Sequence, residues 1–438
     1  MRSSLPLVCT LSILGSTAET VKDRAGAVRD DRSKMENNTR WIYNDWQRGF
    51  AEASQTGKPL MIVLRCVPCL ACMGIDASVL SDPDLTPLLD QFVKVRVINA
   101  NALDLSLFQF DYDLSFSTLF FNGDKTVYGR FGSWTHQKNP GEKDTAALQQ
   151  ALEGTLALHR GYPANKASLV GKQPRPVPVT DPLALPELAG KYKRELDWDG
   201  KVVQSCVHCH QIGDAIRVSY HDKKEKIPRE WIYPMPMPET LGLKLAPDQA
   251  AQIEAVTENS VAAKGGFKAG DVLISLNGQP LLSGADVSWV LHHAPASGTL
   301  RAVVRRQNAE QPLSIELSQD WRLKSDISRR VGTWELRAMA LGGLWLEDLP
   351  ADQKRARELP ATGMALLVKH AGEYGKHAAA KKAGFRKDDI LVAVDGISDQ
   401  ISESEIIGRI LGQHAEGDRL PVTVLRDRER LDLALPVQ

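Results

Sequence analysis

The sequence predicts a multidomain protein in which an α/β domain is followed by a short helical segment and two β-rich units. Helix and strand patterns alternate between residues 41 and 159, a C-x-x-C-H string stands at 206–210, and two C-terminal stretches resemble each other. The length of 438 residues is enough for about three domains. Basic and acidic residues are equal in number, so nothing favours nucleic acid as a general partner.

Residues 1–22 have the pattern of a secretory signal peptide. Arg2 supplies positive charge, Leu5 to Leu14 form a short apolar run, and Ser16-Thr17-Ala18 supply small residues for cleavage. The alternative is a disordered tail. Because no other stretch approaches the ~18 apolar residues of a membrane span, we expect a periplasmic or otherwise exported protein with no transmembrane span. The polar residues 19–38 have no periodicity and are expected to form a flexible lead-in.

Residues 36–160 read as one α/β domain. An amphipathic helix is expected from Trp41 to Gln55, and the apolar run Leu60 to Leu64 suits a fully buried strand. A second strand is expected over residues 92–98. Residues 118–128 suit a hairpin around Asn122-Gly123, because Asn-Gly favours the tight turns of hairpins. A helix over residues 148–158 closes the domain.

A C-x-x-C pair follows the first strand directly, as Cys66-Val67-Pro68-Cys69. A following helix would place the first thiol at a helix N-terminus, where the helix dipole stabilises a thiolate. This order resembles the thioredoxin-like superfamily, which implies Cys66 as catalytic nucleophile and Cys69 as resolving thiol. The chain has Ser117 where thioredoxins have a cis-proline. Cys72 is either a small buried residue or the third thiol of a soft-metal site, for copper or zinc.

Residues 161–197 are rich in proline and are expected to form a linker, and residues 198–235 a haem-binding segment. The string Cys206-Val207-His208-Cys209-His210 is the pattern for covalent attachment of c-type haem. Cys206 and Cys209 would form the thioethers and His210 would ligate the iron, all three on one face of a helix. Met235 and Met237 are candidate distal ligands, with incidental packing as the alternative. A disulfide or a small zinc site is the competing interpretation of the string.

The two C-terminal units, residues 236–320 and 340–438, share a motif order. The strings Gly266-Phe267, Asp271 and Asn277-Gly278 recur 118 residues later as Gly384-Phe385, Asp389 and Asp395-Gly396. Both units resemble bacterial PDZ domains. The resemblance implies that Leu241, Gly242 and Leu243 bind a peptide C-terminus in the first unit, and Gly343 and Leu344 in the second, with the peptide adding to a sheet edge. Internal docking without peptide binding is the alternative.

The whole order resembles an exported, planctomycete-type bacterial family of thioredoxin-like/PDZ proteins. It predicts a thiol-redox or electron-transfer protein, with thiol-disulfide oxidoreductase as the candidate enzyme class, covalent haem c, and PDZ units that recruit a protein partner. One alternative is a non-enzymatic PDZ adaptor or haem-based sensor. A second is soft-metal binding through Cys66, Cys69 and Cys72. No serine-protease string accompanies the PDZ units.

Overall fold

The computed structural model describes residues 23–65, 80, 82–114, 116–132, 145–247 and 249–438. The N-terminal domain holds a five-stranded sheet in the order β1-β3-β2-β4-β5. Its strands are β1 (Ile42–Tyr43), β2 (Leu60–Arg65), β3 (Val93–Val97), β4 (Phe116–Phe121) and β5 (Val127–Phe131). The strands β1, β3 and β2 run parallel, whereas β4 and β5 run antiparallel to their neighbours. The expected buried strand, second strand and hairpin are therefore present.

Helices cover both faces of this sheet. They are α2 (Trp46–Thr56), α6 (Thr145–Arg160), the short η2 (Pro83–Leu85) and α4 (Thr86–Leu89), and the turn η3 (Ala100–Ala102). The sequence pattern predicted that α2 begins at Trp41, five residues before its start in the structure. It starts at Trp46 because the Asp45 side chain accepts the N–H of Arg48 at 2.9 Å and so caps it.

The expected flexible lead-in is instead a helix, α1 (Arg24–Met35). Its buried Val28 packs with Ile98 and Val202, and the Arg29 guanidinium donates to the carbonyls of Trp198 and Gly200. Periodicity failed here because α1 buries one apolar residue and is held mainly by polar contacts.

The proline-rich segment expected as a linker packs against the domains at several points. It forms α7 (Lys166–Leu169), η4 (Val170–Lys172) and η5 (Pro182–Ala184), and both Leu169 and Lys172 are fully buried. Two further helices follow, α8 (Cys209–Asp222) and α9 (Arg229–Ile232). The segment therefore connects the domains and also forms part of the contact between them.

The first β-rich unit contains two sheets. The turn η6 (Pro238–Leu241) leads into β6 (Leu243–Leu245), which pairs with β7 (Ile253–Val256). The larger sheet has the order β11-β10-β8-β9. Its members and helices are α10 (Val261–Lys264), β8 (Val272–Leu276), β9 (Gln279–Pro280), α11 (Gly284–His292), β10 (Gly298–Arg306), β11 (Ala309–Leu317) and η7 (Trp321–Lys324).

The second unit repeats this plan on one five-stranded sheet, β12-β13-β14-β15-β16. Its elements are α12 (Thr333–Leu341), β12 (Leu344–Asp348), α13 (Ala351–Ala356), β13 (Leu366–Ala371), η8 (Gly375–Ala378), α14 (Ala379–Lys382), β14 (Ile390–Val394), α15 (Glu403–Gln413), β15 (Arg419–Arg426) and β16 (Glu429–Pro436).

The internal repeat extends to individual contacts. Arg306 Nε lies 2.7 Å from Asp271 Oδ1 in the first unit, and Arg426 Nε lies 2.7 Å from Asp389 Oδ1 in the second. Each arginine also donates to a glycine carbonyl, that of Gly266 or of Gly384. The repeated Gly and Asp of the sequence are therefore joined by one conserved local arrangement.

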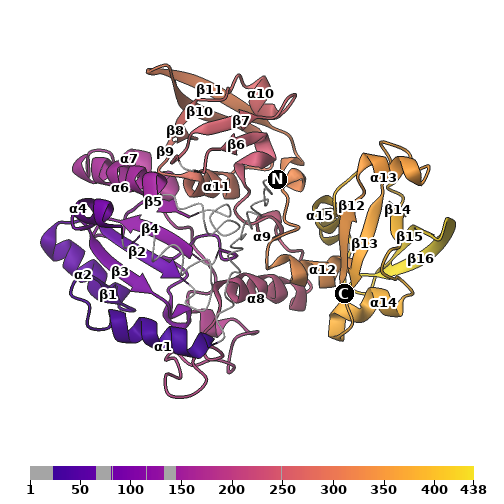
Figure 1. Ribbon diagram of the computed structural model, residues 1–438, viewed down its shortest axis with the longest axis horizontal. Helices are drawn as coiled ribbons and strands as arrows, with labels where there is room; N and C mark the ends of the chain where they lie inside the picture. Colours follow the sequence, from indigo (N-terminus) through magenta and orange to yellow (C-terminus); the bar gives the residue numbers. More distant parts are fainter. Residues whose placement is uncertain (1–22, 66–79, 81, 115, 133–144, 248) are drawn as a thin grey trace, which may run out of the picture.

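The three domains surround α8 and α9 (Figure 1). The first unit places α11 beside β5 of the N-terminal sheet, while the second contacts the rest through α12 and α15. Among the helices in the described ranges, none has the length and apolar character to cross a bilayer.

Candidate functional site

The C-x-x-C motif follows the central strand of the N-terminal sheet. Strand β2 ends at Arg65, which pairs with Phe116 of β4, and Ser117 pairs with Leu64 one step further in. Cys66, Cys69 and Cys72 lie outside the described residues. The buried Arg65 side chain has its Nη1 4.0 Å from Asp31 Oδ1. In the sequence, the predicted nucleophile Cys66 directly follows the carboxyl end of this central strand.

The C-x-x-C-H string is only partly helical. Helix α8 begins at Cys209, and its start is capped because the Gln211 side chain accepts the N–H of His208 at 2.8 Å. Cys206 therefore precedes the helix. The expectation that both cysteines and His210 share one helix face is wrong. The cap at His208 makes the helix begin at Cys209, three residues after Cys206.

The two cysteines of the string face different apolar clusters. Cys206 packs with Val28 and Ile98, and its thiol donates to the Ile98 carbonyl at 3.6 Å. Burial raises the pKa of the Cys206 thiol to about 11. Cys209 packs against the core beside β2 and β3. His210 instead has its Nδ1 3.4 Å from Asp214 Oδ2, one turn along α8.

This arrangement does not fit a haem held by Cys206, Cys209 and His210. Thioether attachment requires both thiols to meet one macrocycle with the imidazole over its iron, whereas here the thiols pack into separate clusters and the imidazole bonds a carboxylate. Three cavities of about 820, 600 and 750 Å³ are lined by none of the three residues. A zinc site is also absent from the described part of the chain, which has no cluster of three His, Cys, Asp or Glu able to hold a metal.

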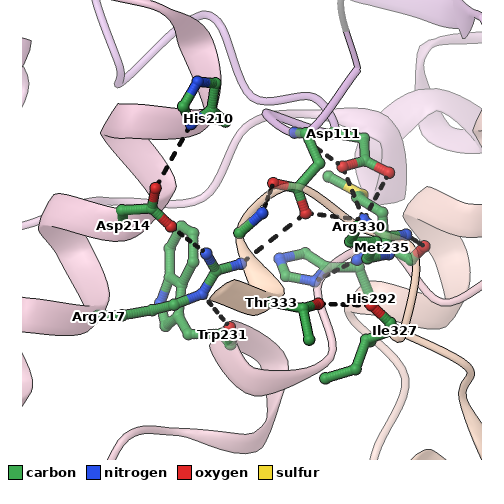
Figure 2. A network of polar contacts seen from close by, with 12 residues as sticks. Asp111, His210, Asp214, Arg217, Trp231, Met235, His292, Ile327, Arg330 and Thr333 are labelled. Atoms are coloured by element: carbon green, nitrogen blue, oxygen red, sulfur yellow. Dashed lines mark hydrogen bonds and ion pairs between the residues drawn. The ribbon is translucent and has the colours of Figure 1, made fainter. Parts of the chain in front are cut away.

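Met235 and Met237 lie away from His210. Met235 is buried, its N–H donates to His292 Nδ1 at 3.4 Å, and its carbonyl accepts from Arg330 at 2.9 Å. Met237 lines the cavity of about 750 Å³. The structure thus places neither methionine with the predicted proximal ligand, and Figure 2 shows Met235 across the network from His210.

A buried network of charges joins the domains, and sequence reasoning missed it. Arg330 Nη1 lies 2.9 Å from Asp111 Oδ1 and 3.4 Å from Asp113 Oδ2, and all three side chains are at most 8% exposed. Asp113 also accepts the N–H of Gly332, while Arg217 of α8 bonds Asp214 and the carbonyl of Trp231 (Figure 2). One sequence signal for it is the Asp-Tyr-Asp string at 111–113.

The loop of the first β-rich unit has the predicted glycine geometry. Gly242 has a φ of 86°, and a Cβ there would lie 2.2 Å from Ser260 Cβ, so only glycine fits. Leu241 and Leu243 are both buried. The N–H of Gly242 donates to the Glu239 carbonyl at 2.9 Å, within the turn η6. Binding of a carboxylate by these residues stays a prediction.

Helix α11 of this unit is fixed to the N-terminal domain. Asp286 accepts from the backbone of Arg130 at 3.1 Å and lies 2.8 Å from Lys172 Nζ, with both side chains almost fully buried. The Arg130 guanidinium lies 3.4 Å from the ring centroid of Trp289, whose indole donates to the Gly171 carbonyl. Burial lowers the pKa of Arg130 to about 9. Strand β5, the proline-rich segment and α11 therefore form one interface.

The cavity of about 750 Å³ lies where this unit meets the N-terminal sheet. One wall comes from β6 and the start of α11, including Leu245 and Gly284. The opposite wall includes Ser117, Arg130 and Phe131 of β4 and β5. The groove between strand and helix of the first unit therefore opens onto the end of the sheet that carries the C-x-x-C motif.

The equivalent groove of the second unit is filled by its own side chains. Glu403, the first residue of α15, accepts the N–H of Leu346 on β12 at 2.7 Å. The same carboxylate pairs with Arg337 of α12, and the two side chains are 3% and 2% exposed. Gly343 donates to the Arg337 carbonyl, and Leu344 is fully buried. The predicted peptide loop of this unit is thus packed beneath α12.

Comparison with known proteins supports the two domain types. A family model described as thioredoxin-like matches residues 41–123, and one described as PDZ domain matches residues 252–306. The chain therefore contains a thioredoxin-like α/β domain together with β-rich PDZ-like units, whose shared plan was described above. We call residues 236–320 PDZ1 and residues 340–438 PDZ2.

The similar curated proteins are described as periplasmic serine endoproteases. A probable periplasmic serine endoprotease DegP-like of Pseudomonas putida (strain GB-1) is 30% identical over 184 residues, 40% of this chain and 37% of that protein. The periplasmic pH-dependent serine endoprotease DegQ of Escherichia coli (strain K12) is 30% identical over 148 residues, 34% of this chain and 28% of that protein. The chain thus spans about a third of the length of these relatives. The HtrA3 PDZ domain bound to a phage-derived ligand is 23% identical, covering 17% of this chain and 81% of that one, with a TM-score of 0.16.

Proposed function

We propose that this chain is an exported thiol-redox protein that recruits polypeptides through a PDZ unit. The observation that carries the proposal is that the central strand β2 ends at Arg65, immediately before Cys66 in the sequence. The sheet order and the matched model are thioredoxin-like, and the similar curated proteins are described as periplasmic. Export to the periplasm would suit disulfide chemistry, because disulfides form and persist in that oxidising compartment.

The chemistry is thiol–disulfide exchange. The Cys66 thiolate attacks one sulfur of a substrate disulfide, forming a mixed disulfide and releasing one substrate thiolate. The Cys69 thiolate then attacks Cys66 sulfur, which releases the second substrate thiol and leaves a Cys66–Cys69 disulfide. Two electrons pass from the motif to the substrate, and an external dithiol restores the motif.

A cysteine substitution tests this chemistry. We expect Cys66→Ser to reduce the rate at which the full chain catalyses reduction of a protein disulfide by dithiothreitol to the uncatalysed rate. The matched control is Cys206→Ser, because the half-buried Cys206 thiol has a pKa raised by desolvation, and its loss should leave the rate unchanged. A Cys66→Ser protein as active as wild type would favour the adaptor alternative, which Ser117 at the usual cis-proline position also suits.

Attachment of haem c to Cys206, Cys209 and His210 remains a separate proposal, supported by the C-x-x-C-H string alone. It requires both thiols to leave the clusters described above. Expression with the haem-attachment machinery should give a pyridine haemochrome spectrum and an intact mass increased by one haem. A mass equal to that of the unmodified chain under these conditions would refute the proposal.

A further inference from the structure

We propose that the cavity of about 820 Å³ binds a small aromatic carboxylate. We call it the shared cavity, because the thioredoxin-like domain, the proline-rich segment, helices α8 and α9, and PDZ1 all contribute to its walls. Its volume lies within the range of about 300–1,000 Å³ that is typical of small-molecule sites. The site is independent of the thiol chemistry proposed above, and neither domain type supplies it alone.

Aromatic side chains from several parts of the chain line the shared cavity. They include Trp231 of α9, Trp289 of α11, Trp321 of η7, and Phe110 and Tyr112 of the thioredoxin-like domain. Aromatic groups attract one another in offset-stacked or edge-to-face contacts. These walls therefore favour a ligand with a flat aromatic body.

His292 supplies a hydrogen-bond donor to this cavity. Its Nδ1 accepts the N–H of Met235 at 3.4 Å, so the neutral imidazole carries its proton on Nε2 (Figure 2). The side chain is 9% exposed and lines the cavity, and within the described ranges Nε2 has no acceptor. A buried N–H without an acceptor is costly. The imidazole therefore favours a ligand that presents an oxygen atom.

Arg322 brings a positive charge to the same wall. Its Nη2 donates to the carbonyls of Leu291, His292 and Ala294 at the end of α11, at 2.8 to 3.1 Å. The side chain is 7% exposed, its Nε has no hydrogen-bond partner, and no carboxylate of the described residues forms an ion pair with it. A buried cation without a counter-charge favours an anionic ligand.

The carboxylates that line the shared cavity do not neutralise Arg322. Asp111 and Asp113 are paired with Arg330, at 2.9 and 3.4 Å. Glu225 and Glu230 lie on the exposed side of the cavity, where solvent screens their charge. The wall built from α11 and η7 thus offers an N–H donor and a positive charge next to aromatic rings, which is the combination that binds an aromatic carboxylate.

Isothermal titration calorimetry of the full chain with naphthalene-2-carboxylate tests the inference. We expect one probe molecule to bind per chain. The uncharged naphthalene-2-carboxamide has the same ring system and should bind about tenfold more weakly, because it gives Arg322 no counter-charge. No binding of the carboxylate, or equal affinity for the two compounds, would overturn the inference.

A glycine of α8 offers a variant that fills the shared cavity. A Cβ on Gly213 would lie 3.6 Å from Arg217 Nη1, an ordinary contact, and both residues line the cavity. We expect Gly213→Leu to weaken probe binding about tenfold or more, whereas Gly213→Ala should bind like wild type. Gly412→Leu is the matched control, because Gly412 is also a helix glycine and a Cβ there meets open space.

Photolabelling of the wild-type chain needs no variant. We expect 4-benzoylbenzoate, a photoreactive aromatic carboxylate, to label residues that line the shared cavity, such as Ile216, Trp231 or Met235, with mass spectrometry of peptides locating the label. Excess naphthalene-2-carboxylate should suppress this label. Labelling confined to other parts of the chain, or wild-type affinity in a folded Gly213→Leu protein, would overturn the inference. Cys66→Ser should bind the probe like wild type, so this result is separable from the test of the thiol chemistry.

Discussion

At the scale of single residues, the buried histidine His292 couples the interdomain contacts to pH. Its Nδ1 accepts the N–H of Met235, which only an unprotonated nitrogen can do. Burial, together with the nearby Arg322, Arg175, Arg330 and Arg130, lowers the pKa of His292 to about 3. The folded protein therefore holds this imidazole neutral throughout the physiological range.

The sign of the pH effect follows from the unfolded state, in which a histidine has a pKa near 6.5. Below that pH the unfolded chain binds a proton that the folded chain does not, so His292 destabilises the fold as pH falls from about 6.5 toward 3. We expect His292→Gln to remove about 1.4 kcal/mol per pH unit from the pH dependence of the unfolding free energy over that window. Urea unfolding at several pH values measures it, with the exposed His370→Gln as control. Equal slopes in wild type and His292→Gln would contradict the assignment.

At the scale of elements, the sequence predicted regular structure well where apolar patterning was strong. The run Leu60 to Leu64 is the fully buried strand β2, and the Asn-Gly hairpin is β4 and β5. The elements that the sequence did not predict correctly are held mainly by polar contacts. Helix α1 buries only Val28, and α8 starts at Cys209 because of a side-chain cap. Such contacts leave little periodic signal in the sequence.

The candidate sites also contain features that the sequence indicated and features that it did not. Leu241, Gly242 and Leu243 lie at the end of the turn η6 and the start of β6, and their binding of a peptide stays a prediction. Whether the groove of a unit is filled depends on two features. One is the first residue of the helix beside it, Gly284 in PDZ1 and Glu403 in PDZ2. The other is whether a helix precedes the loop, as α12 does in PDZ2. A repeat search compares what is shared between units, so it does not reveal the difference that closes PDZ2.

At the scale of the whole molecule, Arg330 links parts of the chain that are far apart in sequence. It joins Asp111 and Asp113 of the thioredoxin-like domain to the connector between the PDZ units and to the carbonyl of Met235. A buried charge that loses its partner is costly, since removing one member of such a pair destabilises by about 3–5 kcal/mol. The network therefore holds the domains in the arrangement that the shared cavity requires.

We expect Arg330→Met to lower the free energy of unfolding by about 3–5 kcal/mol, because it removes the cation 2.9 Å from the buried Asp111 and leaves Asp113 with only the more distant Arg217, at 4.0 Å. The neighbouring exposed Arg329→Met is the control and should change stability by no more than about 0.5 kcal/mol. Urea unfolding of the full chain measures both. If the loss arises at the domain contacts, native-state limited proteolysis should also cut Arg330→Met faster between the thioredoxin-like domain and PDZ2. A stable, protease-resistant Arg330→Met protein would show that the α11 interface, with Asp286 and Lys172, is sufficient to hold the domains together.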